Sequence, residues 1–240
     1  KPQAALTALS HISPTDPFAV QATSLRIALL QGLGRHAEAL GIAQAASTAP
    51  GAGAAEWMQL GDVLAEAQSH QDAALAYGKA LALTSDRDRQ WQLYLVRGGS
   101  YERANDWKKA EPDLRKALEL APDQPVALNY LGYALLDRNL NLEEAQRLIE
   151  KASALRPQDG AITDSLAWVY FRRGNYKRAI ELLESAVRSV PAEPTINEHL
   201  GDAYWHVGRK YEARYSWRAA LVGAEDQPVV ERLRRKIDFG

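Results

Sequence analysis

Pairs of alanine residues seven positions apart recur along almost the whole chain. The pairs are Ala39/Ala46, Ala73/Ala80, Ala110/Ala117, Ala145/Ala152, Ala179/Ala186 and Ala213/Ala220. Successive pairs are offset by 34 to 37 residues. A period of about 34 residues is typical of repeated helix–turn–helix units, whose helix pairs stack on one another. The sequence therefore predicts an all-α chain built from stacked helix pairs.

A large apolar residue followed by a small one precedes the clearer alanine pairs by about twelve residues. These doublets are Leu60-Gly61, Leu131-Gly132, Leu166-Ala167 and Leu200-Gly201, and Gly98 holds the small position of the third repeat. The interval is long enough to end one helix, turn and begin the next. We therefore expect the small residue of each first helix to face the alanine of the second helix, so that the two axes approach closely.

Two repeats depart from this pattern. Ile27 occupies the small position of the first repeat, so we expect its two helices to cross more loosely. Arg97 stands where the other repeats have leucine. Because an unpaired buried charge is costly, Arg97 must reach either solvent or an acidic partner.

Proline and glycine residues mark the ends of the predicted helices. Pro122, Pro157 and Pro191 each follow a second alanine by five residues, and proline cannot continue a helix. Gly174 and Gly208 mark turns within repeats. These signals predict six repeats, at about 20–53, 54–90, 91–124, 125–159, 160–193 and 194–227. An amphipathic helix over 228–238 is expected to cap the array, with its basic side, Arg232, Arg234 and Arg235, in solvent.

The start of the chain has the pattern of a second helix without its first. Within 1–16, Ala5 lies 34 residues before Ala39, at the repeat period. We therefore expect further repeats upstream of Lys1. The predicted domain organisation is a single solenoid over 1–240.

The residues above resemble those of the tetratricopeptide repeat proteins, from Gln21 to Val222 and most clearly from Trp91 onward. The resemblance implies a right-handed α-solenoid, or superhelix, of about six repeats plus the C-terminal capping helix. The segments LNYLGYALLDRNLNLEEA and INEHLGDAYWHVGRKYEAR are also similar to the carboxy-terminal arrays of such proteins from the Gram-negative cell envelope. That similarity implies a non-enzymatic scaffold or adaptor, periplasmic or attached to the outer membrane through a missing N-terminal region. A cytoplasmic location is the alternative.

The resemblance also places the first helices on a concave inner surface. Positions three and two before the small residue, and one, four and five after it, then point into the groove. In the last three repeats they predict a partner-binding set: Asn129, Tyr130, Tyr133, Asp164, Ser165, Trp168, Phe171, Arg172, Glu198, His199, Asp202, Trp205 and His206. Aromatic groups rimmed by charge indicate a protein or peptide partner. The excess of acids favours a partner with apolar anchors and a basic residue. The alternative is that Tyr133, Trp168 and Trp205 pack only on the next repeat.

Composition excludes several classes of protein. The formal net charge is −1, so no sequence-wide basic field favours nucleic acid. Because there is no cysteine, disulfides and thiolate metal sites are excluded. No apolar run approaches the ~20 residues of a membrane-spanning helix.

The sequence contains no recognisable catalytic motif, so we expect no enzyme activity. His199, Asp202 and His206 share one helical face and could ligate a metal, but their spacing matches no known metal motif. We therefore expect no metal or cofactor. Two alternatives to the adaptor stay open: a self-associating structural subunit of a homo-oligomer, and an unrecognised metalloprotein or hydrolase.

Overall fold

The computed structural model describes residues 2–13 and 16–239, and these contain only α-helices as regular elements. The helices are α1 (Pro2–Ser10), α2 (Ala19–Gly32), α3 (His36–Thr48), α4 (Ala54–Glu66), α5 (His70–Ala82), α6 (Arg87–Arg103), α7 (Trp107–Leu120), α8 (Pro125–Asp137), α9 (Leu142–Leu155), α10 (Gly160–Arg172), α11 (Tyr176–Ser189), α12 (Pro194–His206), α13 (Lys210–Gly223) and α14 (Gln227–Phe239). The predicted all-α class is confirmed. Of the helix expected over 1–16, residues 1, 14 and 15 lie outside the described part.

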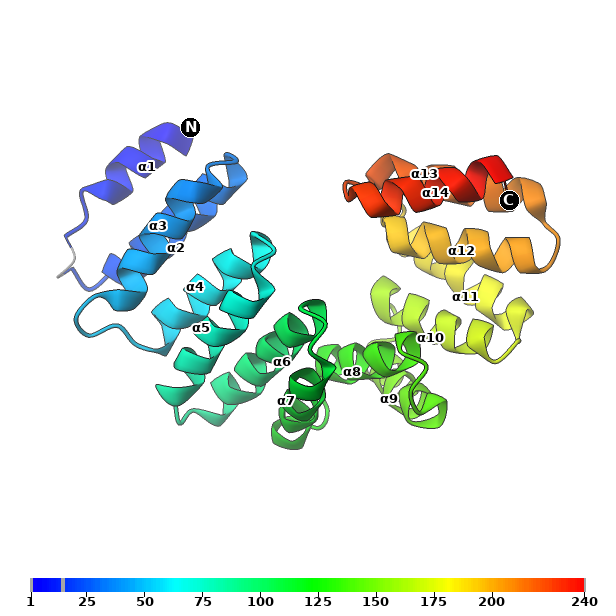
Figure 1. The fold of residues 1–240 in the computed structure, drawn as a ribbon, viewed down its shortest axis with the longest axis horizontal. Coiled ribbons are helices and arrows are strands. Elements are labelled where there is room, and N and C mark those ends of the chain that lie inside the picture. The colour runs from blue at the N-terminus through cyan, green and yellow to red at the C-terminus, as the bar shows by residue number, and fades with distance from the viewer. Residues whose placement is uncertain (1, 14–15, 240) are drawn as a thin grey trace. The chain divides into compact units, whose positions relative to one another are not determined.

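The chain divides into two compact units, an N-terminal unit (1–122) with α1–α7 and a C-terminal unit (123–240) with α8–α14. Within each unit, helices that follow one another in sequence lie side by side (Figure 1). Six helix pairs run from α2/α3 to α12/α13, and their second helices all lie within the predicted repeats. Helix α6 begins at Arg87, before the expected boundary at 91, because the Asp86 carboxylate caps it by accepting from the Asp88 amide at 3.0 Å. The prediction of one continuous array stays a prediction.

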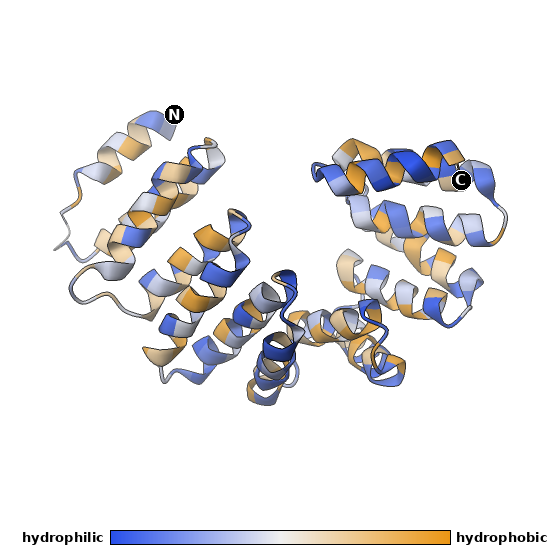
Figure 2. Cartoon of the chain, viewed as in Figure 1, coloured by the Kyte–Doolittle hydropathy of each residue, from blue (hydrophilic) through white to orange (hydrophobic). Residues whose placement is uncertain are grey.

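The repeated alanines lie at the centre of each helix pair. The first alanine of every pair is completely buried, as is the second in the last five repeats. Figure 2 shows the corresponding mixture of hydrophobic and hydrophilic residues along each helix, as expected for helices with one buried side. Burial of one stripe per helix, rather than of a single central core, is therefore what holds each unit together.

The contact made by the small residue differs in part from the expected one. A Cβ atom at Gly61 would lie 2.4 Å from Cε1 of Tyr77, which comes four residues after Ala73. The missing side chain thus makes room for a large side chain on the second helix. The same arrangement occurs in four repeats: Gly61 with Tyr77, Gly98 with Leu114, Gly132 with Ile149 and Gly201 with Trp217. In two of these repeats the alanine also faces the glycine, as expected, since a Cβ at Gly98 or Gly132 would lie 3.2 or 3.1 Å from the backbone oxygen of Ala110 or Ala145.

Each of the six pairs has a residue in the left-handed backbone region at its turn: Gly34, Gln68, Asn105, Asn139, Gly174 and Gly208, with φ between 57° and 82°. The turn between α8 and α9 has a second such residue, Asn141, with φ of 40°. Glycine and asparagine tolerate this conformation, whereas glutamine does so at a cost. Gln68 is therefore the strained member of the set.

Both departures from the repeat pattern have structural consequences. Ile27 is buried, and α2 and α3 are the least closely packed of the six pairs, as expected. Arg97 has found an acidic partner. Its Nε and Nη2 atoms donate to the two carboxylate oxygens of Asp113 at 2.6 and 2.7 Å. This bidentate ion pair replaces the apolar contact that leucine makes in the other repeats.

Candidate partner-binding site

All of the residues predicted to face a partner lie on three helices of the C-terminal unit. Asn129, Tyr130 and Tyr133 lie on α8, and the others lie within 164–172 of α10 and 198–206 of α12. These are the first helices of three successive repeats, and α10 contacts both α8 and α12. The structure therefore gathers the predicted set on neighbouring helices.

A connected series of rings crosses the three helices. We call it the aromatic row; its members are Tyr133, Trp168, Phe171, Tyr176, His199 and His206. Trp168 is stacked between two of them. Its ring lies 4.4 Å from that of Phe171 with the planes at 4°, and 4.0 Å from that of His199 with the planes at 13°. Both faces of this indole are covered, so only its edge can meet a partner. For Trp168 this favours the alternative of packing between repeats.

The rest of the row reaches toward solvent. Phe171 is half-buried, and the rings of Tyr176 and His206 approach it edge-on at 5.3 and 4.9 Å. Tyr133 lies at the other end, with its ring 6.4 Å from that of His199. His206 is exposed and forms the accessible end of the row.

A buried polar pair fixes the orientation of His199. Its Nδ1 atom lies 2.8 and 3.0 Å from the two carboxylate oxygens of Asp164 on α10. The two residues are only 8% and 5% exposed. A carboxylate oxygen accepts, so His199 donates through Nδ1, which holds its ring parallel to Trp168. Burial, followed by the negative charge of Asp164, raises the pKa of Tyr133, so its phenol stays neutral.

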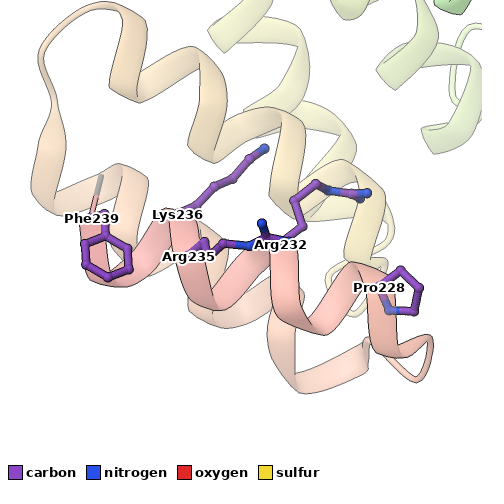
Figure 3. Close-up of a pocket in the computed structure, with 5 residues that line it drawn as sticks. All are labelled: Pro228, Arg232, Arg235, Lys236 and Phe239. Carbon is purple, nitrogen blue, oxygen red and sulfur yellow. The ribbon is translucent and has the colours of Figure 1, made fainter.

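The carboxylates of α12 are paired with basic side chains of α14. Arg232 donates to both carboxylate oxygens of Glu198 at 2.8 Å. The Nζ atom of Lys236 lies 2.7 Å from Oε1 of Glu198 and 2.7 Å from both oxygens of Asp202, which also accepts from Nε1 of Trp217 at 2.9 Å. Burial opposes ionisation of Glu198, but the hydrogen bonds from Arg232 and Lys236 outweigh it and lower its pKa to about 2. Figure 3 shows Arg232 and Lys236 leaving α14 on the same side.

These pairs correct two expectations. Asp164, Glu198 and Asp202 were expected to attract a basic residue of a partner, but each is already bonded within the chain. Of the basic side of the capping helix, which was expected in solvent, Arg234 and Arg235 are exposed, whereas Arg232 and the neighbouring Lys236 bind the carboxylates of α12. The physical reason is the same in both cases. A buried carboxylate is costly to desolvate without a partner; His199 is the partner of Asp164, and α14 supplies cations to Glu198 and Asp202.

Other members of the predicted set serve the fold or remain unpaired. Arg172 donates to the backbone oxygen of Leu136 at 3.1 Å and to Oδ1 of Asn139 at 2.8 Å, which ties α10 to the end of α8. Ser165 is buried, and its hydroxyl donates to the backbone of its own helix. Asn129 is different, because its buried Oδ1 has no hydrogen-bond partner among the described residues.

The accessible apolar surface of the site lies around Trp205. This ring is half-buried; Nζ of Lys210 lies 4.8 Å from its centroid, and the Trp217 ring is 5.6 Å away. His206 follows it in sequence and is exposed, and Tyr130 on α8 is half-buried. Trp205 and His206 therefore offer a partner more surface than Trp168 does.

Sequence reasoning missed three contributors, Tyr176, Arg232 and Lys236. The two cations had a signal in the sequence. Glu198 and Arg232 are 34 residues apart, as are Asp202 and Lys236. The two members of each pair therefore occupy the same position in successive repeats and carry opposite charges. Helix α14 thus stands in the register of a further first helix. Tyr176 begins a second helix, where the counting rule for first helices does not apply.

The proposed metal-ligating trio does not converge. His199 faces Asp164, whereas Asp202 faces Lys236. In the described part of the chain, no group of three or more histidine or acidic side chains is placed to hold a metal ion. Nor does any helix in residues 2–13 and 16–239 combine the length and apolarity needed to cross a bilayer.

The tetratricopeptide repeat family model matches residues 95–160 and 165–228, more than half of the chain. The chain therefore belongs to the tetratricopeptide repeat family. Its helical-solenoid fold is that of a scaffold for protein–protein interaction.

One relative is the TPR repeat-containing protein PA4667 of Pseudomonas aeruginosa, which is 34% identical over 142 residues. The match covers 53% of this chain and 24% of that protein, so it spans about a quarter of the relative's length. Among solved structures, a tetratricopeptide repeat protein from Parabacteroides merdae is 17% identical, with a TM-score of 0.78 over 98% of this chain and 90% of that one. YrrB, described as a TPR protein with an unusual peptide-binding site, is 19% identical, with a TM-score of 0.56 over 87% of this chain and 100% of that one. Both structural likenesses show the fold.

Proposed function

We propose that the C-terminal unit binds a segment of a partner protein across α8, α10 and α12, as a non-enzymatic adaptor. The aromatic row is the observation that carries this proposal. Several of its rings remain half-buried, and His206 is exposed. Apolar surface in a polar surround is typical of protein interaction sites. The peptide-binding site named for YrrB supports a peptide segment as the occupant.

The site favours apolar anchors over charged ones. Trp205, His206 and the edge of Phe171 supply apolar surface, whereas Glu198 and Asp202 of α12 are paired with cations of α14. Because paired charges attract a partner only weakly, we expect binding to depend little on salt concentration.

Affinity capture with the full-length protein, followed by mass spectrometry, tests the proposal. The test variant is the double change Trp205→Ala and His206→Ala, and the control is Glu181→Ala on the exposed side of α11. We expect specific polypeptides to be lost with the double variant and kept with the control. Identical capture by all three proteins would refute the site. Trp168→Ala is less suitable, because removal of a doubly stacked ring perturbs the packing of α10 against α12.

We also propose that the protein works in a bacterial envelope, on the similarity of its two C-terminal repeat segments to envelope proteins of this family. Fractionation of cells carrying the full-length protein, with protease added to spheroplasts, tests this. Digestion in spheroplasts but not in intact cells is the expected result. Resistance in spheroplasts with the protein in the cytosolic fraction would overturn it.

A further inference from the structure

Helix α13 carries a stripe of large, fully exposed side chains. Tyr211, Tyr215 and Val222 are 86%, 76% and 90% exposed. Together with Arg218 they are spaced by four, three and four residues, so they lie on one side of the helix. We call these four residues the α13 tyrosine face. Exposed tyrosines in such a row need an explanation, because packing among the described residues leaves them exposed.

The neighbouring repeats show that the fold does not require this face. Counted from the first alanine of each pair, its positions in α11 hold Lys177, Glu181, Glu184 and Arg188. In α9 the same positions hold Glu143, Arg147, Glu150 and Ala154. Helices α9 and α11 therefore pack into the same unit with a mainly charged surface at these positions. Only α13, among the three second helices of this unit, presents aromatic and apolar groups there.

The charges around the face are mainly basic. Lys210, Arg214 and Arg218 lie on α13, and Arg218 makes no ion pair within the described residues. The acidic residue of the helix, Glu212, is already bonded to Arg209 at 2.9 Å. A partner that covers the tyrosines therefore meets the guanidinium of Arg218, which can pair with an acidic side chain.

We propose that the α13 tyrosine face docks an acidic amphipathic helix of a partner protein. Apolar residues of that helix pack on Tyr211 and Tyr215, and its acidic residues pair with Arg218. The stripe from Tyr211 to Val222 extends roughly 16 Å along the helix axis, at ~1.5 Å per residue, which matches three turns of a partner helix. Tyrosine and arginine are also the side chains that most often dominate binding energy at interfaces. This surface is separate from the aromatic row, so either proposal can fail alone.

A display library of randomised helical peptides, selected against the full chain, tests the proposal. Counter-selection uses the variant Tyr211→Lys with Tyr215→Glu, which places there the residue types found at the same positions of α11. The control variant is Leu75→Glu, at an exposed position of α5. We expect peptides that are net acidic with one apolar stripe. Measured by fluorescence anisotropy, the double variant should bind the peptides at least tenfold more weakly. The Arg218→Glu variant should also bind them more weakly, and that binding should no longer depend on salt concentration. The Leu75→Glu variant should bind them with unchanged affinity. Circular dichroism should show all variants equally folded, since the changed residues are exposed.

Four outcomes would overturn the proposal. The first is that no selected peptide depends on Tyr211 and Tyr215. The second is that the dependent peptides are neutral or basic. The third is that the chain sediments with phosphatidylserine–phosphatidylcholine vesicles and the double variant does not, which would assign the face to an anionic membrane. The fourth is a wild-type dimer in analytical ultracentrifugation that the double variant loses, which would assign the face to a second copy of the chain.

Discussion

Replacing Gly61 by alanine tests whether the glycine of a first helix is required by packing. The added Cβ would lie 2.4, 2.6 and 2.8 Å from three ring atoms of Tyr77, well inside the ~3.5–4.0 Å of a favourable contact. The ring cannot swing away freely, because Tyr77 is buried and its hydroxyl donates to Oδ1 of Asp62 at 2.7 Å. Overpacking costs about 1–3 kcal/mol, and such short contacts place this site in the upper half of that range. Alanine regains about 1 kcal/mol of helix propensity, so we expect a net loss of about 1–2 kcal/mol.

The matched control is Gly41→Ala in α3, in the same unit. Gly41 is exposed, and a Cβ there would have no neighbour within 4 Å. This variant should therefore gain about 0.5–1 kcal/mol from helix propensity alone. Urea unfolding followed by far-ultraviolet circular dichroism measures both variants against the wild type. Because the propensity gain is common to both, the difference between them isolates the packing cost, about 2–3 kcal/mol. If Gly61→Ala were as stable as Gly41→Ala, the packing argument would be refuted.

Three further predictions concern the stability of the folded chain at single sites. The folded pKa of Glu198 is lowered to about 2 from 4.5, so its stabilisation is complete above pH 4.5 and is lost as the pH falls toward 2. Acid titration of unfolding should show an extra loss on the order of 2–3 kcal/mol in the wild type that Glu198→Gln lacks. Gln68→Gly should raise the free energy of unfolding by about 1 kcal/mol in urea, since φ there is 60°, and an unchanged midpoint would contradict the claim of strain. Arg97→Leu should destabilise by about 1–3 kcal/mol because it leaves the carboxylate of Asp113 unpaired. A thermal melt should show most of that loss recovered in the double variant Arg97→Leu with Asp113→Leu, and no recovery would mean that the ion pair is not the cause.

The helix pairs could be predicted from the sequence because their packing is local and periodic. Every first alanine is buried, as its spacing predicts. Helices α7, α9 and α11 end two residues before Pro122, Pro157 and Pro191. The acidic partner of Arg97 was expected as a type of contact, but Asp113 could not be named. Its position depends on which side chain of α7 faces α6.

The candidate site was harder to predict because the position of a residue in the repeat gives the direction of its side chain but not the groups that the side chain contacts. Asp164 and Glu198 were correctly assigned to neighbouring first helices, but Glu198 is paired with Arg232, which lies outside the counted positions, and Asp164 is bonded to another member of the predicted set, His199. Trp168 points where the register predicts, yet two other rings cover its faces. Long side chains such as Arg232 reach across a whole repeat, and a positional rule for one helix cannot anticipate them.

Photo-crosslinking in living cells tests most directly whether α8, α10 and α12 hold a partner. The photoreactive residue p-benzoyl-phenylalanine replaces His206, the exposed end of the aromatic row, in the full-length protein. The same residue in place of Glu181, exposed on α11 of the same unit, is the control. We predict a discrete crosslinked polypeptide from position 206 and none from position 181. Crosslinks of equal yield and identity at both positions, or none at position 206, would contradict the account.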